Sequence, residues 1–205
     1  LYGYFPGSFV GNPSLKPESS RGFEVSLRYR RGSVEAALTG YRQRLHDEIV
    51  DNATFTSTMN APGTSHRAGV EAELGWKLSD TLRISANYAY LHATQPSSSG
   101  SGQVRELRRP KNSGSVALQA RWPKLTYGAS LAYSGAHLDV RDRPPYDVLR
   151  LGSYWLAGAR VAYAVRPGVE LFARAANALN SRYQDVSGYR TEGRSLYAGI
   201  RLSRR

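Results

Sequence analysis

The chain of 205 residues carries a net charge of +12, has a hydrophobic content of 40% and contains no cysteine, which excludes disulfide scaffolds and cysteine-based zinc or redox sites. No stretch approaches the roughly 20 consecutive apolar residues of a membrane-spanning helix, so helical spans are excluded while a β-barrel remains open. The basic residues, 24 of them Arg, are spread along the chain without a block longer than two, which argues against a nucleic-acid-binding tail.

Nine stretches of the sequence alternate apolar with polar residues, the pattern of a β-strand whose two faces meet different surroundings. In the first stretch, Phe23, Val25 and Leu27 fall on one face, and Glu24 and Ser26 fall on the other. Each stretch is close to the roughly 9–11 residues that a tilted strand needs to cross a bilayer. The nine predicted strands cover residues 19–30, 33–45, 66–77, 81–93, 111–122, 125–136, 153–164, 168–177 and 193–203.

The connections between the predicted strands alternate between short and long. Short turns follow the first, third, fifth and seventh strands, and long polar loops follow the others. Bacterial outer-membrane barrels have this arrangement, with the short turns on the periplasmic side. The predicted long loops cover residues 46–65, 94–110, 137–152 and 178–192.

Four aromatic residues close a predicted strand directly before a short turn. They are Tyr29, Trp76, Trp122 and Tyr163. An aromatic ring with a polar edge suits the boundary where an apolar band ends and water begins. Their shared position beside the short turns predicts a ring of membrane-interface aromatics on the periplasmic side.

A soluble β-sandwich would also show strands that alternate, and it is the main alternative to a membrane barrel. A sandwich buries its apolar face with bulky residues, whereas the apolar face here is rich in Ala and Tyr. The opposite face carries charges in mid-strand, among them Glu71, Arg83, Arg160 and Arg174. We therefore predict an all-β fold, an antiparallel transmembrane β-barrel fragment of about nine meandering strands.

Several motifs resemble one family of membrane proteins. The segment GNPSLKPE at residues 11–18, followed by a predicted strand, resembles the GNPxLxPE motif of TonB-dependent outer-membrane receptors. Later segments resemble the vitamin B12 (cobalamin) receptor branch of that family, in the same order along the chain. They are GYRQRLHDEIV at 40–50, HRAGVEAE at 66–73, LRRPK at 107–111 and ARAANALNSRYQDVSGYRTEGRS at 173–195.

The resemblance implies that residues 1–205 are the C-terminal portion of a roughly 22-stranded barrel, whose plug and earlier strands are absent from this sequence. It implies active uptake of a large scarce nutrient, with cobalamin as the leading candidate, across the bacterial outer membrane with energy from TonB. The alternatives are a siderophore or haem receptor of the same family or, in another class, a soluble basic β-protein that binds nucleic acid. The implied partners are the cobalamin or iron-chelate ligand, the TonB complex through the missing plug, and outer-membrane lipid and lipopolysaccharide. Neither nucleic acid nor a cofactor is expected.

Two ligand contacts follow from the same resemblance. Arg108 matches the arginine of the Leu-Arg-Arg motif, and Tyr189 matches the tyrosine of the G-Y-x-T-x-G-R motif. An arginine and an aromatic face suit a large planar ligand with amide and phosphate edges. Arg141 and Tyr146, in another long loop, are weaker candidates for the same role, and basic loops could equally contact lipopolysaccharide phosphates. In the alternative interpretation, Arg108 is a loop charge and Tyr189 is a packing residue.

Metal or hydrolytic chemistry is suggested only by the cluster His46, Asp47 and Glu48, with Asp51 nearby. Neighbouring residues on a strand point to opposite faces, which argues against a shared site. The other histidines, His66, His92 and His137, stand alone. No nucleophile, base and orienting group occur in recognisable spacing, so we expect no catalytic residue, no metal site and no enzymatic activity.

Overall fold

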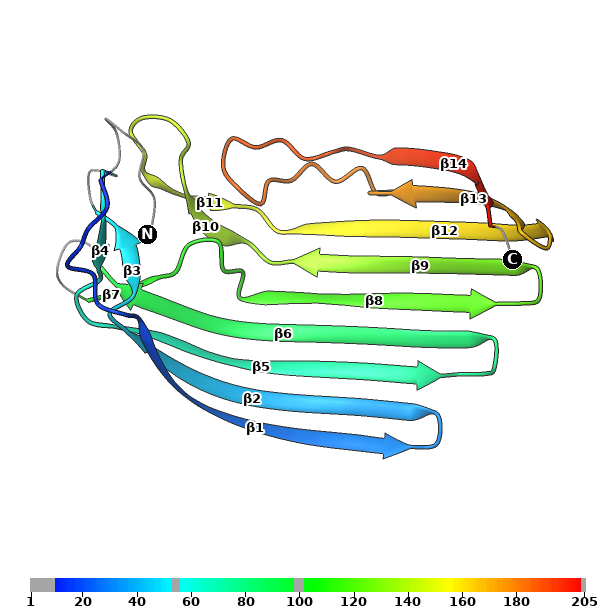
Figure 1. Ribbon diagram of the computed structural model, residues 1–205, viewed down its shortest axis with the longest axis horizontal. Helices are drawn as coiled ribbons and strands as arrows, with labels where there is room; N and C mark the ends of the chain where they lie inside the picture. Colours follow the sequence, from blue (N-terminus) through cyan, green and yellow to red (C-terminus); the bar gives the residue numbers. More distant parts are fainter. Residues whose placement is uncertain (1–9, 53–55, 98–101, 204–205) are drawn as a thin grey trace. The chain divides into compact units, whose positions relative to one another are not determined.

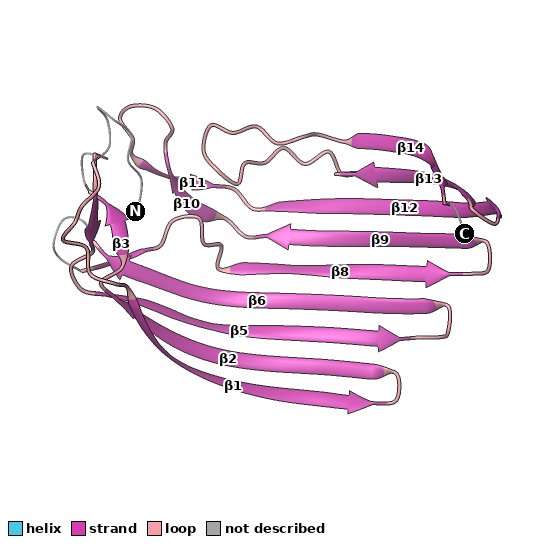
Figure 2. Cartoon of the chain, in the orientation of Figure 1, coloured by secondary structure: helices cyan, strands magenta, loops and turns pink. Residues whose placement is uncertain are grey.

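A computed structural model describes residues 10–52, 56–97 and 102–203 of the chain. Every regular element in this part is a strand (Figure 2). In this same part, no helix is long and apolar enough to span a membrane. The long strands are β1 (Ser19–Arg31), β2 (Val34–His46), β5 (Thr64–Lys77), β6 (Leu82–Pro96), β8 (Asn112–Arg121), β9 (Leu125–Ser134), β12 (Tyr154–Arg166), β13 (Val169–Ala176) and β14 (Ser195–Leu202).

These nine strands pair in the order β1-β2-β5-β6-β8-β9-β12-β13-β14, as Figure 1 shows. Each strand neighbours the next long strand in the sequence, and the pairs with a defined register are antiparallel. The antiparallel meander of about nine strands predicted from the sequence is therefore confirmed.

The described residues form two compact units, and β1, β2, β5 and β6 contribute to both. The described residues of the first unit are 10–25, 40–52, 56–69, 91–97 and 102–106. The described residues of the second unit are 26–39, 70–90 and 107–203.

Five further strands lie within segments that the sequence predicted as long loops. In the first unit, β3 (Ile49–Asp51) pairs with β4 (Thr58–Asn60), and β7 (Gln103–Arg105) extends the sheet beside β6. In the second unit, β10 (His137–Val140) pairs with β11 (Val148–Leu151). These strands have only three or four residues, too few for an alternating pattern to identify them.

Side chains in the sheet of the second unit fall in rows that cross the strands. One row contains Leu118, Ala129, Ala159, Ala175 and Leu196. The next row, one residue along each strand, contains Gln119, Gly128, Arg160, Arg174 and Tyr197. Because successive side chains point to opposite faces, the apolar row lies on one face and the polar row on the other.

The sheet has no hydrophobic core of the kind that a soluble sandwich requires. Within the described residues, the only buried apolar side chains are those of Ala93, Ala120 and Ala162. Large apolar side chains stay exposed, including Leu196 and Ile200 on the apolar face of β14. Such a face is expected in a sheet that meets lipid, and it argues against the sandwich alternative.

Candidate ligand-binding loops

All four predicted ligand contacts lie in connections at the long-loop ends of the strands in the second unit. Arg108 lies between β7 and β8, Arg141 and Tyr146 lie between β10 and β11, and Tyr189 lies between β13 and β14. Arg108 and Tyr146 have positive φ values of 56° and 55°, which are uncommon for residues other than glycine. Strained backbone of this kind is concentrated at functional sites, so the observation favours a binding role.

Arg108 is anchored by a buried carboxylate that the sequence analysis did not single out. Its Nε donates to Asp139 Oδ1 at 2.8 Å, and its backbone amide donates to the Leu138 carbonyl at 2.7 Å. The Asp139 side chain has 0% exposure, whereas the Arg108 side chain remains 57% exposed. Arg108 is thus both a structural partner and an accessible cation.

Asp139 also joins this loop to the one that carries Tyr189. The backbone amide of Ser187 donates to Asp139 Oδ2 at 2.7 Å, and that of Val140 donates to Oδ1 at 2.8 Å. Burial by itself would raise the pKa of Asp139, but the Ser187 amide, the Arg108 guanidinium and the Val140 amide together hold that pKa below its usual value. We call Arg108, Asp139 and Ser187 the loop junction.

The lowered pKa of Asp139 predicts how the loop junction responds to acid. Because the folded-state pKa lies below the unfolded value of about 3.9, the stabilisation is complete above that pH and is lost as the pH falls through the folded-state pKa. Pepsin cleavage within residues 177–194 should therefore increase below about pH 4. Asp139→Asn should already be cleaved readily at pH 5, and a wild-type loop that resists pepsin until the sheet unfolds would contradict the prediction.

A second set of contacts secures the loop between β13 and β14. His137 is buried, and its Nε2 lies 3.1 Å from the Asp185 carbonyl oxygen. The Tyr154 hydroxyl donates to Asp185 Oδ1 at 2.5 Å, and the ring of Tyr154 stacks on Tyr183 with centroids 4.1 Å apart. The histidine that the sequence presents as isolated therefore has a structural role.

The other candidates differ in how firmly they are held. Arg141 pairs with Asp147 at 2.7 Å, and both side chains are about half exposed. Tyr146 and Tyr189 are 58% and 72% exposed. The structure thus links Arg108 to the loop of Tyr189 through Asp139, and it leaves Arg141 and Tyr146 at the tip of the β10–β11 hairpin.

The four predicted interface aromatics occupy equivalent places in the second unit. Tyr29, Trp76 and Tyr163 lie near the ends of β1, β5 and β12, and Trp122 directly follows β8. Each ring is exposed by 41–52% and adjoins a short turn. Their role at the membrane interface remains a prediction that these positions support.

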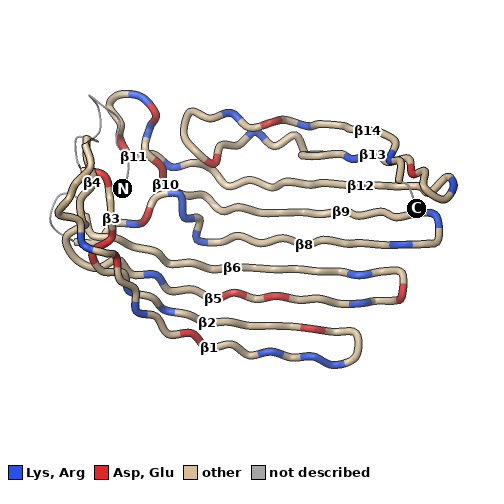
Figure 3. Tube along the Cα trace, viewed as in Figure 1, with Lys and Arg blue, Asp and Glu red and all other residues tan. Residues whose placement is uncertain are grey.

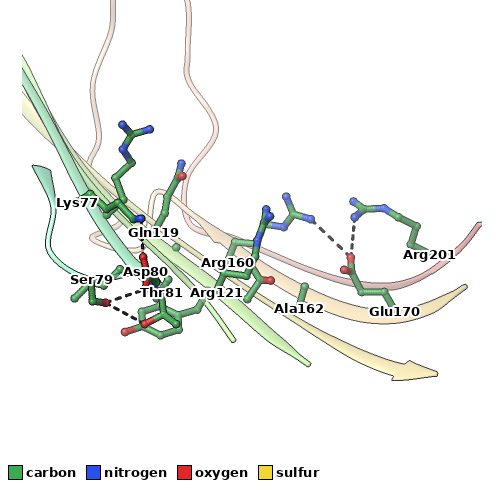
Figure 4. Close-up of a pocket in the computed structure, with 16 residues that line it drawn as sticks. Lys77, Ser79, Asp80, Thr81, Gln119, Arg121, Arg160, Ala162, Glu170 and Arg201 are labelled. Carbon is green, nitrogen blue, oxygen red and sulfur yellow. Dashed lines mark hydrogen bonds and ion pairs between the residues drawn. The ribbon is translucent and has the colours of Figure 1, made fainter. Parts of the chain in front are cut away.

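The polar face near the short turns carries a basic groove of about 720 Å³. Figure 3 shows Lys and Arg near the short turns of these strands, as well as in the long connections at their other ends. In Figure 4, Arg160 and Arg201 point at Glu170, with N–O distances of 3.9 and 2.7 Å. Arg83 and Arg121 line the same groove. A sheet face with this many charged side chains is unsuited to lipid. The opposite, apolar face is therefore the one that meets the membrane.

In the first unit, the GNPSLKPE segment fastens the connection between β2 and β5. Asn60 accepts a hydrogen bond from the Lys16 amide at 2.8 Å and donates to the carbonyls of Lys16 and Asp47 at 2.9 and 2.7 Å. Glu18 Oε1 accepts from the Ile49 amide at 2.5 Å. This motif therefore has a structural role that sequence reasoning did not identify.

Removing the Asn60 side chain is expected to release this connection. Asn60→Ala deletes three hydrogen bonds, so local opening of residues 47–63 should become easier by about 1–3 kcal/mol. Hydrogen exchange of peptides from this segment measures the effect. Asn87→Ala, which removes a single exposed hydrogen bond to Ser115, is the control and should leave the segment protected.

In the cluster at residues 46–51, His46 and Glu48 contact neighbouring side chains. Glu48 accepts a hydrogen bond from Ser65 at 2.5 Å and pairs with Arg67 at 3.2 Å, while Arg67 also binds Glu106 at 2.8 Å. His46 Nδ1 lies 3.0 Å from the Thr64 hydroxyl. Among the described residues, no group of acidic or histidine side chains is placed to hold a metal ion.

Comparisons with known proteins match this architecture. A family model described as "TonB dependent receptor-like, beta-barrel" matches residues 1–178. The "Iron-regulated outer membrane virulence protein" of Vibrio cholerae is 26% identical over 214 residues, which cover 96% of this chain and 33% of that protein. The chain thus spans about a third of the length of this curated relative.

Solved structures show the same fold. The ferripyoverdine receptor of the outer membrane of Pseudomonas aeruginosa, solved bound to ferripyoverdine, superposes with a TM-score of 0.75 and 17% identity over 92% of this chain and 27% of that one. The siderophore receptor PiuA from Acinetobacter baumannii superposes with a TM-score of 0.70 and 22% identity over 89% of this chain and 28% of that one.

Proposed function

Because the chain belongs to the TonB dependent receptor-like β-barrel family, we propose that its parent protein takes up an iron chelate across the bacterial outer membrane with energy from TonB. The family match over residues 1–178 is the observation that carries this proposal. Members of this family are outer-membrane transporters rather than enzymes, so the predicted location and the predicted class are confirmed. The match also argues against the soluble nucleic-acid-binding alternative.

The cargo favoured by the comparisons differs from the first prediction. The sequence motifs pointed to cobalamin, but the three relatives reported above are named for iron regulation, ferripyoverdine or siderophores, and none of these names refers to cobalamin. The alternative of an iron-chelate receptor is therefore better supported. An exposed guanidinium such as that of Arg108 suits the carboxylate, catecholate or hydroxamate oxygens of a ferric chelate.

We also propose that earlier barrel strands and a plug belong to the parent protein. Within the described residues, β1 and β14 lie at the two ends of the strand order. Open sheet edges are costly in a membrane because their backbone groups find no water to bond. Additional strands would satisfy both edges, and a plug would place polar groups against the basic groove.

Iron uptake by cells that express the intact parent protein tests this function. Ferric citrate, a ferric catecholate and a ferric hydroxamate, each carrying radioactive iron, are supplied with and without a functional TonB. We expect uptake of at least one chelate that depends on TonB and is not competed by cobalamin. Uptake of cobalamin with no response to any ferric chelate would overturn the iron proposal and restore the first prediction.

Arg108→Ala and Tyr189→Ala are each expected to weaken binding of the transported chelate by about 10-fold or more, because each removes a charged or aromatic contact. Arg141→Ala and Tyr146→Ala should have smaller effects, since these residues lie at the hairpin tip. Equilibrium binding to the purified parent protein measures all four. Arg166→Ala, beside a short turn, is the control and should bind normally.

A further inference from the structure

In the loop junction, the carboxylate of Asp139 bonds to two other loops and to its own strand. Asp139 accepts hydrogen bonds from the side chain of Arg108, the amide of Ser187 and the amide of Val140, at 2.7–2.8 Å. Arg108 and Ser187 are 79 residues apart in the sequence, and both bond to this side chain. A carboxylate with no exposure is stable only when its oxygens are satisfied in this way, so the arrangement has little freedom to shift.

We propose that Asp139 is a positioning residue for ligand binding, which holds Arg108 and the loop of Tyr189 so that both face the chelate together. This inference rests on the proposed function. It concerns a residue that need not touch the ligand, because Asp139 is wholly buried and acts through its two partners.

The geometry of Arg108 fits this role. Its Nε donates to Asp139, while the side chain as a whole stays 57% exposed. An arginine fixed in this manner offers two parallel donors in a set direction, and less side-chain freedom is lost when a ligand binds. The hydrogen bond from its amide to the Leu138 carbonyl fixes the backbone of the same residue.

The second oxygen of the same carboxylate, Oδ2, holds the loop of Tyr189. Ser187 is buried and bonded to Asp139, and Tyr189 follows two residues later in a turn in which its amide donates to the Val186 carbonyl at 3.2 Å. The ring of Tyr189 is exposed, so the chain is held at Ser187 and the aromatic face is presented beyond it. Loss of Asp139 would free both candidate contacts at once.

Asp147 offers a matched comparison in the same β10–β11 hairpin. It also pairs with an arginine, Arg141, at 2.7 Å, and the two residues lie six positions apart in the same connection. Its side chain is 49% exposed, and within the described part of the chain its side-chain partner is Arg141 of the same connection. A partly exposed pair of this kind contributes little to stability.

The test measures binding of ferric citrate, a ferric catecholate and a ferric hydroxamate to the full-length parent protein. For the chelate that binds, Asp139→Asn should weaken affinity by about 10-fold or more, and Asp147→Asn by less than about threefold. The double variant Asp139→Asn with Arg108→Ala should lose clearly less affinity than the product of the two single losses, because Asp139 acts through Arg108 as well as through the loop of Tyr189. Wild-type affinity in Asp139→Asn, or fully additive losses in the double variant, would overturn the proposal.

Hydrogen exchange separates this inference from the proposed function. In the absence of any ligand, Asp139→Asn should raise exchange at least about 10-fold in peptides covering both 107–111 and 177–194, and Asp147→Asn should affect only the hairpin tip. If no ferric chelate binds the wild type, the iron proposal fails, and exchange still decides the positioning role. Unchanged exchange in both peptides would overturn it. Should Asp139→Asn fail to reach the outer membrane, Asp139→Glu keeps the charge, displaces the carboxylate and should give a smaller increase in both peptides.

Discussion

Ala129→Arg is expected to destabilise the membrane-inserted parent protein by about 2–4 kcal/mol, whereas Ser130→Arg should change its stability by less than about 1 kcal/mol. The two residues are neighbours near the middle of β9. Ala129 lies in the apolar row with Leu118 and Ala159, and Ser130 lies on the opposite face, which carries Arg160 and Arg174. A charge at Ala129 would enter the hydrocarbon region, but a charge at Ser130 would face polar surroundings.

Urea unfolding of the parent protein in phospholipid vesicles measures both changes. Because the substituted residues are adjacent and both exposed, differences in strand propensity or packing cannot account for a large contrast between them. Equal destabilisation by the two substitutions would contradict the assignment of the faces. A larger effect of Ser130→Arg would show that the apolar row faces inward.

The sequence predicted the long strands well because a period of two, sustained over eight or more residues, is typical of a strand with two different faces and does not suit a helix. The rows of the second unit then follow from the pairing of consecutive strands. The short strands were missed because three or four residues are too few to identify a strand by its alternation. In β10, the alternating pattern is present, but the residues that become buried are His137 and Asp139, while Leu138 and Val140 lie on the other side.

Asp139 could not be identified from the sequence as a buried residue. An aspartate in a long polar loop is usually a solvated charge, and only the tertiary structure brings Arg108 and Ser187 to it. Arg108 and Tyr189 were found through resemblance to a family motif rather than from local pattern. The motif Asn-Pro-Ser-Leu-Lys-Pro-Glu at residues 12–18 identified the family, but its contacts with Asn60 and Ile49 depend on a connection more than 30 residues away.

Gly188→Ala is expected to displace the loop that carries Tyr189 and to weaken chelate binding by about 10-fold or more. Gly188 has a φ of 83°, a conformation that costs other residues about 1–2 kcal/mol. An added Cβ would also lie 2.1 Å from Asp142 Oδ2 and 2.9 Å from Asp142 Cβ. Rotation of the Asp142 side chain can move its oxygen but not its Cβ, so the loop itself must shift away from the β10–β11 hairpin.

Gly152→Ala provides the matched control for this substitution. Gly152 lies in the short connection between β11 and β12 of the second unit, and an added Cβ there meets nothing within 4 Å. Its affinity and its hydrogen exchange should match those of the wild type. Asp142→Gly in the Gly188→Ala background removes the clash and leaves only the backbone strain, so it should recover part of the lost affinity. If Gly188→Ala by itself bound the chelate normally, contact between this loop and the hairpin would not be needed for binding. The loop junction would then stabilise the loops without positioning the ligand contacts.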